Sequence, residues 1–209
     1  MIENIKAGII EALKLELPGE SAHRLLLPAG RELYPVIDRT TILQSSVLLL
    51  LFPHHGKICT CFIRRPSNMR HHGGQIAFPG GRYELRDKDL IHTALRESHE
   101  EIGTESEQIE ILGGLTPLYV EVSNFTINPF VGWTGQKPNF VIDNREVEEV
   151  FVVPIEKLQH HSATQMKTVT TSHGTLDVPG FYNDELFIWG ATAMVLSEFN
   201  EVYKLPGTN

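Results

Sequence analysis

Residues 78–103 constrain this chain most, because they specify a turn, a loop and a helix in one short stretch. The sequence there is FPGGRYELRDKDLIHTALRESHEEIG. The two glycines predict a turn, and a polar loop follows it. A helical pattern then runs from about Asp89 to Ile102, where Gly103 suits the end of a helix. Asp87 and Asp89 are both candidates for the residue that caps its first turn.

Three carboxylates, Glu97, Glu100 and Glu101, are spaced to share one side of this helix, so we expect them to face outward. The roughly opposite side is suited to burial and carries Ile91, Leu95, Ser98 and Ile102. Like charges so close together repel, and a bound Mg²⁺ or Mn²⁺ would offset that cost, since these ions prefer carboxylate oxygens. The alternative is a solvated face on which Arg96 and other bases balance the acids.

The surrounding pattern resembles the Nudix box, written G-(x)n-R-E-x-x-E-E-x-G. Its matching residues here are Gly81, Arg96, Glu97, Glu100, Glu101 and Gly103. Ser98 and Thr104 stand where the usual box has aliphatic residues, and Lys88 stands where it has a glutamate. The gap from Gly81 to Arg96 is also one residue longer than usual. Asp87 and Asp89 are alternatives for the supporting role of the missing glutamate.

A second motif precedes the box and looks like the coenzyme A pyrophosphatase branch of the same family. That branch has R-S-x3-R-x3-G-x3-F-P-G-G, and this chain has Arg65, Arg70, Gly74 and the FPGG run at matching positions, with Pro66 in place of the serine. The two motifs interlock over residues 65–103. Similar stretches at residues 128–132 and 188–193 extend the resemblance to most of the chain.

The resemblance implies an α/β (α+β) fold, the Nudix α/β/α sandwich with a mixed central sheet. It also implies that Glu97, Glu100, Glu101 and the Gly80 carbonyl hold Mg²⁺ or Mn²⁺. Arg96 belongs to the same catalytic set, where we expect it to anchor the loop rather than to touch substrate.

A further carboxylate and three basic residues complete the expected site. The E-V-x-x-V-F-x-V-P pattern assigns to Glu146 the glutamate that completes the metal site or acts as base, with Glu148 and Glu149 as competitors. Arg65, Arg70 and His72 are candidates for phosphate binding, because an arginine fork suits phosphate oxygens. The alternative for the arginines is pairing with nearby carboxylates.

The implied reaction is metal-dependent hydrolysis of coenzyme A or acyl-CoA to adenosine 3′,5′-bisphosphate and 4′-phosphopantetheine or its acyl form. One alternative is a Nudix hydrolase of ADP-ribose or NADH. Another is a non-catalytic nucleotide-binding module, against which the three retained glutamates argue. A homodimer is a further expectation from the resemblance.

Composition limits the other partners and the compartment. The formal net charge of −8 over 209 residues disfavours nucleic acid and anionic membranes, which bind basic patches. Cys59 and Cys61 alternate along an apparent strand, so we expect buried free thiols on one face and a reducing compartment. The start MIENIKAG shows no secretory pattern, which indicates a cytoplasmic protein.

Hydrophobic periodicity predicts the remaining elements. We expect an N-terminal helical extension over residues 1–40, with a helix at 3–17 and an irregular segment at 20–40, before a Nudix domain over 41–209. Strands are expected at 46–52 and 58–64 around a hairpin loop, then at 109–119, 125–133 and 150–153. A polar pair of strands surrounds Gly174, an apolar-rich segment covers 181–189, and a helix covers 191–199, extending to about Lys204.

Overall fold

The computed structural model describes residues 2–34, 42–67, 73–159, 164–171, 174–183 and 186–204. Its α-helices are α1 (Ile2–Ala12), α2 (Glu20–Arg24), α3 (Leu90–Ile102) and α5 (Gly190–Tyr203). The strands of the larger sheet are β1 (Leu43–His54), β2 (Lys57–Arg64), β3 (Ile76–Ala77), β4 (Gly80–Arg82), β5 (Glu110–Gly114), β6 (Leu118–Val120), β7 (Phe125–Trp133) and β8 (Glu149–Pro154). A smaller sheet contains β9 (Thr164–Thr171), β10 (Gly174–Asn183) and β11 (Leu186–Trp189). Two short 3-10 turns are η2 (Ser106–Gln108) and η3 (Ile155–Leu158).

The larger sheet is mixed, as the sequence predicts. Its strand order is β3-β2-β1-β7-β5, with β4 also paired to β1, β6 to β7 and β8 to β2. The central pair β1 and β7 runs parallel, and the other pairs run antiparallel. Strand β1 therefore lies in the interior, which explains its nearly continuous apolar run.

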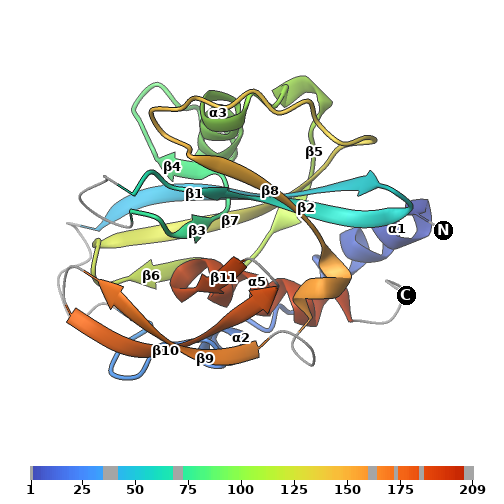
Figure 1. The fold of residues 1–209 in the computed structure, drawn as a ribbon. Coiled ribbons are helices and arrows are strands. Elements are labelled where there is room, and N and C mark those ends of the chain that lie inside the picture. The colour runs from blue at the N-terminus through green and yellow to red at the C-terminus, as the bar shows by residue number, and fades with distance from the viewer. Residues whose placement is uncertain are drawn as a thin grey trace.

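Side chains of β1 alternate between two separate apolar cores. Leu48 and Leu50 pack in a core with Ala94 and Ile102 of α3. Leu49 and Leu51 face the other way, into a core shared with helices α1 and α5 and the smaller sheet. Figure 1 shows α3 on one side of the larger sheet, with α2, α5 and β9–β11 on the other. This layered arrangement confirms the predicted sandwich.

The connection between β1 and β2 is a tight hairpin turn. His55 and Gly56 have positive φ values of 50° and 75°. Positive φ values are required in the two-residue turns whose geometry matches the twist of paired strands. The predicted hairpin is confirmed, and its strands are longer than expected. Cys59 and Cys61 on β2 are buried free thiols in the core beneath α3, also as expected.

The N-terminal segment differs from the prediction in two places. Helix α1 ends at Ala12, where the last hydrogen bonds tighten to a spacing of three residues, although Leu13 and Leu17 still pack on the core. The segment predicted to be irregular contains α2, which begins directly after Gly19. Ile9 and Leu26 are fully buried in the same core as Phe199 of α5, so this segment packs against the sheet and α5.

The C-terminal part follows the sequence pattern closely. Strands β9 and β10 pair antiparallel on either side of Gly174, and β11 adds to β10 to complete the smaller sheet. Helix α5 starts at Gly190 and runs to Tyr203. None of the helices in the described ranges is both long and apolar enough to cross a membrane.

Candidate active site

Helix α3 is fixed at both ends by the residues that the sequence marks. The side chain of Asp89 accepts a hydrogen bond of 2.7 Å from the backbone N–H of His92, which makes Asp89 the cap. Gly103 ends the helix in the left-handed conformation, with φ of 70°. The helix therefore presents its carboxylates at a defined rotation relative to β4.

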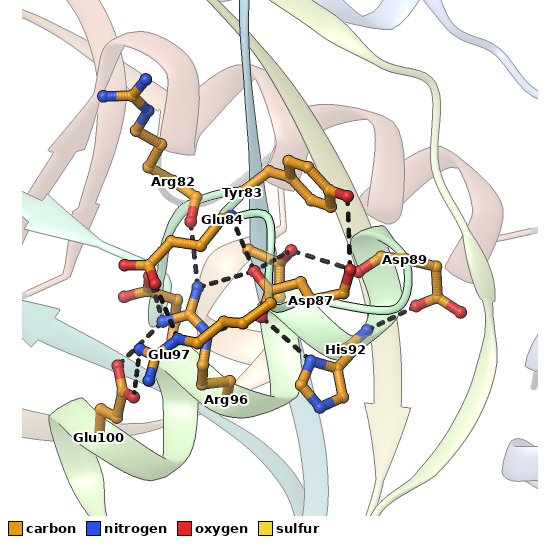
Figure 2. A network of polar contacts seen from close by, with 11 residues as sticks. Arg82, Tyr83, Glu84, Asp87, Asp89, His92, Arg96, Glu97 and Glu100 are labelled. Atoms are coloured by element: carbon orange, nitrogen blue, oxygen red, sulfur yellow. Dashed lines mark hydrogen bonds and ion pairs between the residues drawn. The ribbon is translucent and has the colours of Figure 1, made fainter.

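The other cap candidate, Asp87, is the partner of Arg96. The Nε and Nη2 atoms of Arg96 donate to the two carboxylate oxygens of Asp87 at 2.8 and 2.9 Å, and Figure 2 shows this pair at the centre of the loop network. Arg96 holds the pKa of the buried Asp87 carboxyl well below its usual range. Asp87 thus takes the place of the glutamate that the box has at Lys88, whose side chain is exposed.

Arg96 makes contacts that fix the loop between β4 and α3. Its Nη1 donates to Glu97 at 2.8 Å and to Glu100 at 2.9 Å, and its Nη2 donates to the backbone oxygen of Arg82 at 3.1 Å. Only 9% of its side chain is exposed. These contacts match the role that the sequence predicts for Arg96, which is to anchor the loop.

Glu101 is buried, which corrects the expectation that all three carboxylates face outward. Its residue is 2% exposed, and its Oε2 accepts a hydrogen bond of 2.8 Å from the backbone N–H of Gly80. Burial raises the pKa of its carboxyl to about 8, and the charges of Glu97 and Glu146 act in the same direction. The cause is tertiary: β4 pairs with β1 and covers this part of the helix.

The two glycines of β4 let its backbone lie directly on the helix. A Cβ atom at Gly81 would come within 2.4 Å of the Glu97 carboxylate. At Gly80, where φ is 151°, a Cβ atom would lie 2.2 Å from the backbone oxygen of Ser46. No side chain would fit at either position without a shift. The role of the Gly80 carbonyl as a metal ligand stays a prediction.

Glu146 lies within electrostatic reach of the helix carboxylates. Burial raises the pKa of Glu97, and the charges of Glu100 and Glu146 also contribute. Glu148 and Glu149 are the alternatives to Glu146, and both lie beside Arg64. The Glu148 backbone N–H donates to the Arg64 carbonyl, and the Glu149 side chain pairs with Arg64 at 3.1 Å. The assignment of the additional glutamate to Glu146 stays a prediction.

Glu100 is the most exposed of the three helix carboxylates. It pairs with Arg86 at 3.2 Å as well as with Arg96, and 40% of its side chain is exposed. Across the ranges that the structure describes, no three His, Cys, Asp or Glu side chains are grouped to hold a metal ion.

The donor chemistry nevertheless fits a hard divalent cation. Glu97, Glu101 and Glu146 place carboxylate charge next to one another, and burial makes the ionised form of Glu101 costly. A bound cation would compensate that charge, and carboxylate oxygens are the ligands that Mg²⁺ and Mn²⁺ prefer. These residues therefore suit a metal that joins protein carboxylates to phosphate.

A cavity of about 590 Å³ is connected to this group through the glycines of β4, which contact Glu97 and Glu101. Gly80 and Gly81 of β4 line one part of it, and much of the remaining wall is apolar, with contributions from Val47, Ile76, Phe78, Ile127, Trp189 and Met194. Arg65 also lines it, and the buried Nε of this side chain has no hydrogen-bond partner among the described residues. A bound phosphate oxygen would satisfy that donor.

The sequence did not predict some residues that line the cavity, and two of the residues predicted to bind phosphate are not described by the structure. Arg70 and His72 lie outside the described residues. Arg31 and Arg82 line the cavity but were not expected to. Arg82 directly follows the double glycine, which was an available signal, whereas no local pattern marks Arg31 in its irregular segment.

Comparisons with known proteins agree with this fold. A family model described as the NUDIX domain matches residues 42–172. The uncharacterized Nudix hydrolase NudL of Pectobacterium atrosepticum is 33% identical over 155 residues, or 74% of this chain and 80% of that protein. The peroxisomal coenzyme A diphosphatase NUDT7 of Mus musculus is 34% identical over 129 residues, or 62% of this chain and 54% of that protein.

Among solved structures, a MutT/nudix family protein from Enterococcus faecalis has the same kind of fold. Its TM-score is 0.50 at 17% sequence identity, over 82% of this chain and 65% of that one. The family model and the named relatives, in agreement with the layered fold, make this chain a hydrolase of phosphoanhydride bonds. The chain belongs to the Nudix family, as the family model and the relatives show.

Proposed function

We propose that this protein hydrolyses the diphosphate of coenzyme A or acyl-CoA in a reaction that requires Mg²⁺ or Mn²⁺. The products are adenosine 3′,5′-bisphosphate and 4′-phosphopantetheine or its acyl form. The observation that carries the proposal is the position of Gly80 and Gly81. These residues contact Glu101 and Glu97 on one side and line the 590 Å³ cavity on the other.

Glu97, Glu100, Glu101 and the Gly80 carbonyl are the proposed metal ligands, with Glu146 nearby. When bound, the metal would neutralise phosphate oxygens and lower the pKa of a water molecule. Arg96 positions Glu97 and the loop through the contacts described above. Glu97 or Glu146 orients or deprotonates the attacking water, since each is a carboxylate beside the same group.

The cavity and the second motif support this choice of substrate. Arg65, the first residue of that motif, contributes a buried donor without a partner, which suits a phosphate oxygen. The apolar wall suits the pantetheine and acyl parts of the substrate, because burying their methylene groups is favourable. The name of the mouse relative, a coenzyme A diphosphatase, supports the same substrate.

Another Nudix substrate such as ADP-ribose or NADH is the second candidate, since the carboxylate group serves any diphosphate. A non-catalytic binding module is the third. The retained Glu97, Glu100 and Glu101 argue against that module. The homodimer also stays a proposal, which sedimentation of the purified protein would test.

The test is product analysis with coenzyme A, ADP-ribose and NADH, each with Mg²⁺, with Mn²⁺ and with chelator. We expect metal-dependent release of 4′-phosphopantetheine, fastest from coenzyme A. Glu101→Gln should lower kcat by about a hundredfold or more, because it removes an ionisable carboxylate from the site. The matched control is Glu107→Gln, at an exposed position on η2.

Three results would overturn parts of the proposal. Faster turnover of ADP-ribose or NADH would keep the chemistry and replace the substrate. Normal turnover by Glu101→Gln would remove the metal-site assignment. An absence of turnover with all three compounds would favour the binding module.

A further inference from the structure

Arg31 lies in the wall of the cavity on a segment that the Nudix motifs do not include. It follows α2, and Leu27, Pro28 and Glu32 of the same segment also line the cavity. Its guanidinium pairs with Glu121 at 3.6 Å, and 35% of the side chain is exposed. That separation is longer than a hydrogen bond, so Glu121 leaves the donors of Arg31 available.

A buried polar cluster holds this segment against α5. Glu198 of α5 is fully buried and accepts hydrogen bonds from the Gly19 backbone at 3.2 Å, and from the Thr116 backbone and hydroxyl. It also contacts His23 Nε2 at 3.0 Å. The Ser197 hydroxyl donates to the Ala22 carbonyl at 2.7 Å. These contacts anchor α2 and the residue before it, from which the segment with Arg31 continues.

The anchored segment lies on the opposite side of the larger sheet from the carboxylate helix. Leu26 packs in the core that also contains Phe199, whereas Ala94 of α3 packs in the other core. Figure 1 shows α2 and α3 on opposite sides of the sheet. Arg31, Gly80 and Gly81 nevertheless line the same cavity, and the backbone of Gly80 contacts Glu101 of the carboxylate helix.

The cavity that Arg31 lines offers room for the rest of a molecule whose diphosphate is bound at Gly80 and Gly81. We propose that Arg31 binds a second anionic group of the substrate, a phosphomonoester on its ribose. The proposal rests on the proposed function. The phosphomonoester is the group that distinguishes coenzyme A from ADP-ribose and NADH. A phosphate would make charge-assisted hydrogen bonds that Glu121 does not make.

Other charges near Arg31 set the conditions for this contact. Arg65 and Arg82 line the same cavity and attract an anion, whereas Glu32 and Glu121 oppose it. The phosphomonoester must compete with Glu121 for Arg31. Neutralising Glu121 should therefore strengthen binding, and removing Arg31 should weaken it.

The kinetic experiment compares coenzyme A with 3′-dephospho-coenzyme A. We expect Arg31→Ala to raise KM for coenzyme A by about tenfold. This is the lower end of the effect expected for a hydrogen bond between charged groups, because the site is partly exposed. KM for 3′-dephospho-coenzyme A and kcat for both substrates should stay within about twofold. Arg31→Lys should restore part of the preference, and Glu121→Gln should lower KM for coenzyme A. The control is Arg24→Ala, whose side chain pairs with Glu20 on α2.

A binding measurement keeps the inference separate from catalysis. Calorimetry would compare adenosine 3′,5′-bisphosphate with AMP, which lacks the second phosphate. We expect the wild type to bind the bisphosphate about tenfold more tightly and Arg31→Ala to lose that difference. Equal effects of Arg31→Ala on both nucleotides, or on neither, would overturn the role of Arg31. Failure to turn over coenzyme A, with this binding preference present, would overturn only the proposed function.

Discussion

The Thr104 hydroxyl donates a hydrogen bond of 2.9 Å to Ser98 Oγ, and both residues are buried. These are the two positions at which the Nudix box usually has aliphatic residues. Each polar substitution alone would bury an unsatisfied hydroxyl, which costs free energy. Together the two side chains satisfy one another, so the two departures from the box form one compensated pair.

Single and double variants should show this compensation. We expect Ser98→Ala and Thr104→Val each to lower the free energy of unfolding by about 1 kcal/mol, because each leaves a buried hydroxyl without its partner. The double variant should regain most of that loss. Denaturant unfolding of the wild type, the two single variants and the double variant measures the coupling free energy. Strictly additive losses would show that the hydrogen bond makes no net contribution to stability.

Asp87 should matter far more than its neighbour Asp89. Asp87→Asn removes the charge paired with the buried Arg96, and we expect the free energy of unfolding to fall by about 3 kcal/mol. Turnover should fall as well, since Arg96 holds Glu97. Asp89→Asn is the matched control and should change stability by less than about 0.5 kcal/mol, because asparagine caps helices as well as aspartate does. Equal losses in the two variants would contradict these roles.

The stability of the metal-free protein should fall as pH rises, through Glu101. Its carboxyl has an ordinary pKa of 4.5 when unfolded and a pKa of about 8 in the fold. Between these values the folded state binds more protons than the unfolded state, so stability is lost as pH rises from about 4.5 to 8. We expect the wild type to lose about 2 kcal/mol more than Glu101→Gln over this range.

Thermal melts of both proteins at pH 5 and pH 8, with chelator, measure that difference. Adding Mg²⁺ at pH 8 should restore stability to the wild type and have little effect on Glu101→Gln, because a ligand stabilises the state that binds it. Identical pH profiles of the two proteins would show that Glu101 ionises normally.

The two glycines of β4 should respond differently to alanine. At Gly81 the added Cβ atom meets the end of the Glu97 side chain, which can move. We expect Gly81→Ala to fold with a loss below about 1 kcal/mol and to lower kcat by about a hundredfold through displacement of Glu97. At Gly80 the added atom meets the backbone of β1, so Gly80→Ala should lose about 3 kcal/mol or more. Melting curves and kcat separate the two effects, and normal turnover by Gly81→Ala would contradict a role for Glu97.

Local patterns predicted most elements of this fold. The β1–β2 hairpin follows from apolar runs on both sides of a turn, and the ends of α3 follow from a cap residue and Gly103. The alternation of Cys59 and Cys61 predicted one buried face for both thiols. Such signals depend on residues a few positions apart, so the sequence contains them directly.

The candidate site was predicted only in part. The sequence identified Glu97, Glu100 and Glu101 and left open which aspartate supports Arg96. It missed the burial of Glu101, because that burial depends on β4 and on its pairing with β1. It also gave no sign that Arg31 lines the cavity.

The sequence by itself determined the helix, the glycine that ends it, its row of acids and the family to which the chain belongs. Only the tertiary structure decided that Asp87 pairs with Arg96, that Glu101 is buried against the Gly80 backbone, and that the segment after α2 lines the cavity. The physical reason is the distance along the chain over which each effect acts. Helix periodicity and capping act within a few residues, whereas burial and charge pairing depend on which distant segments the fold brings together.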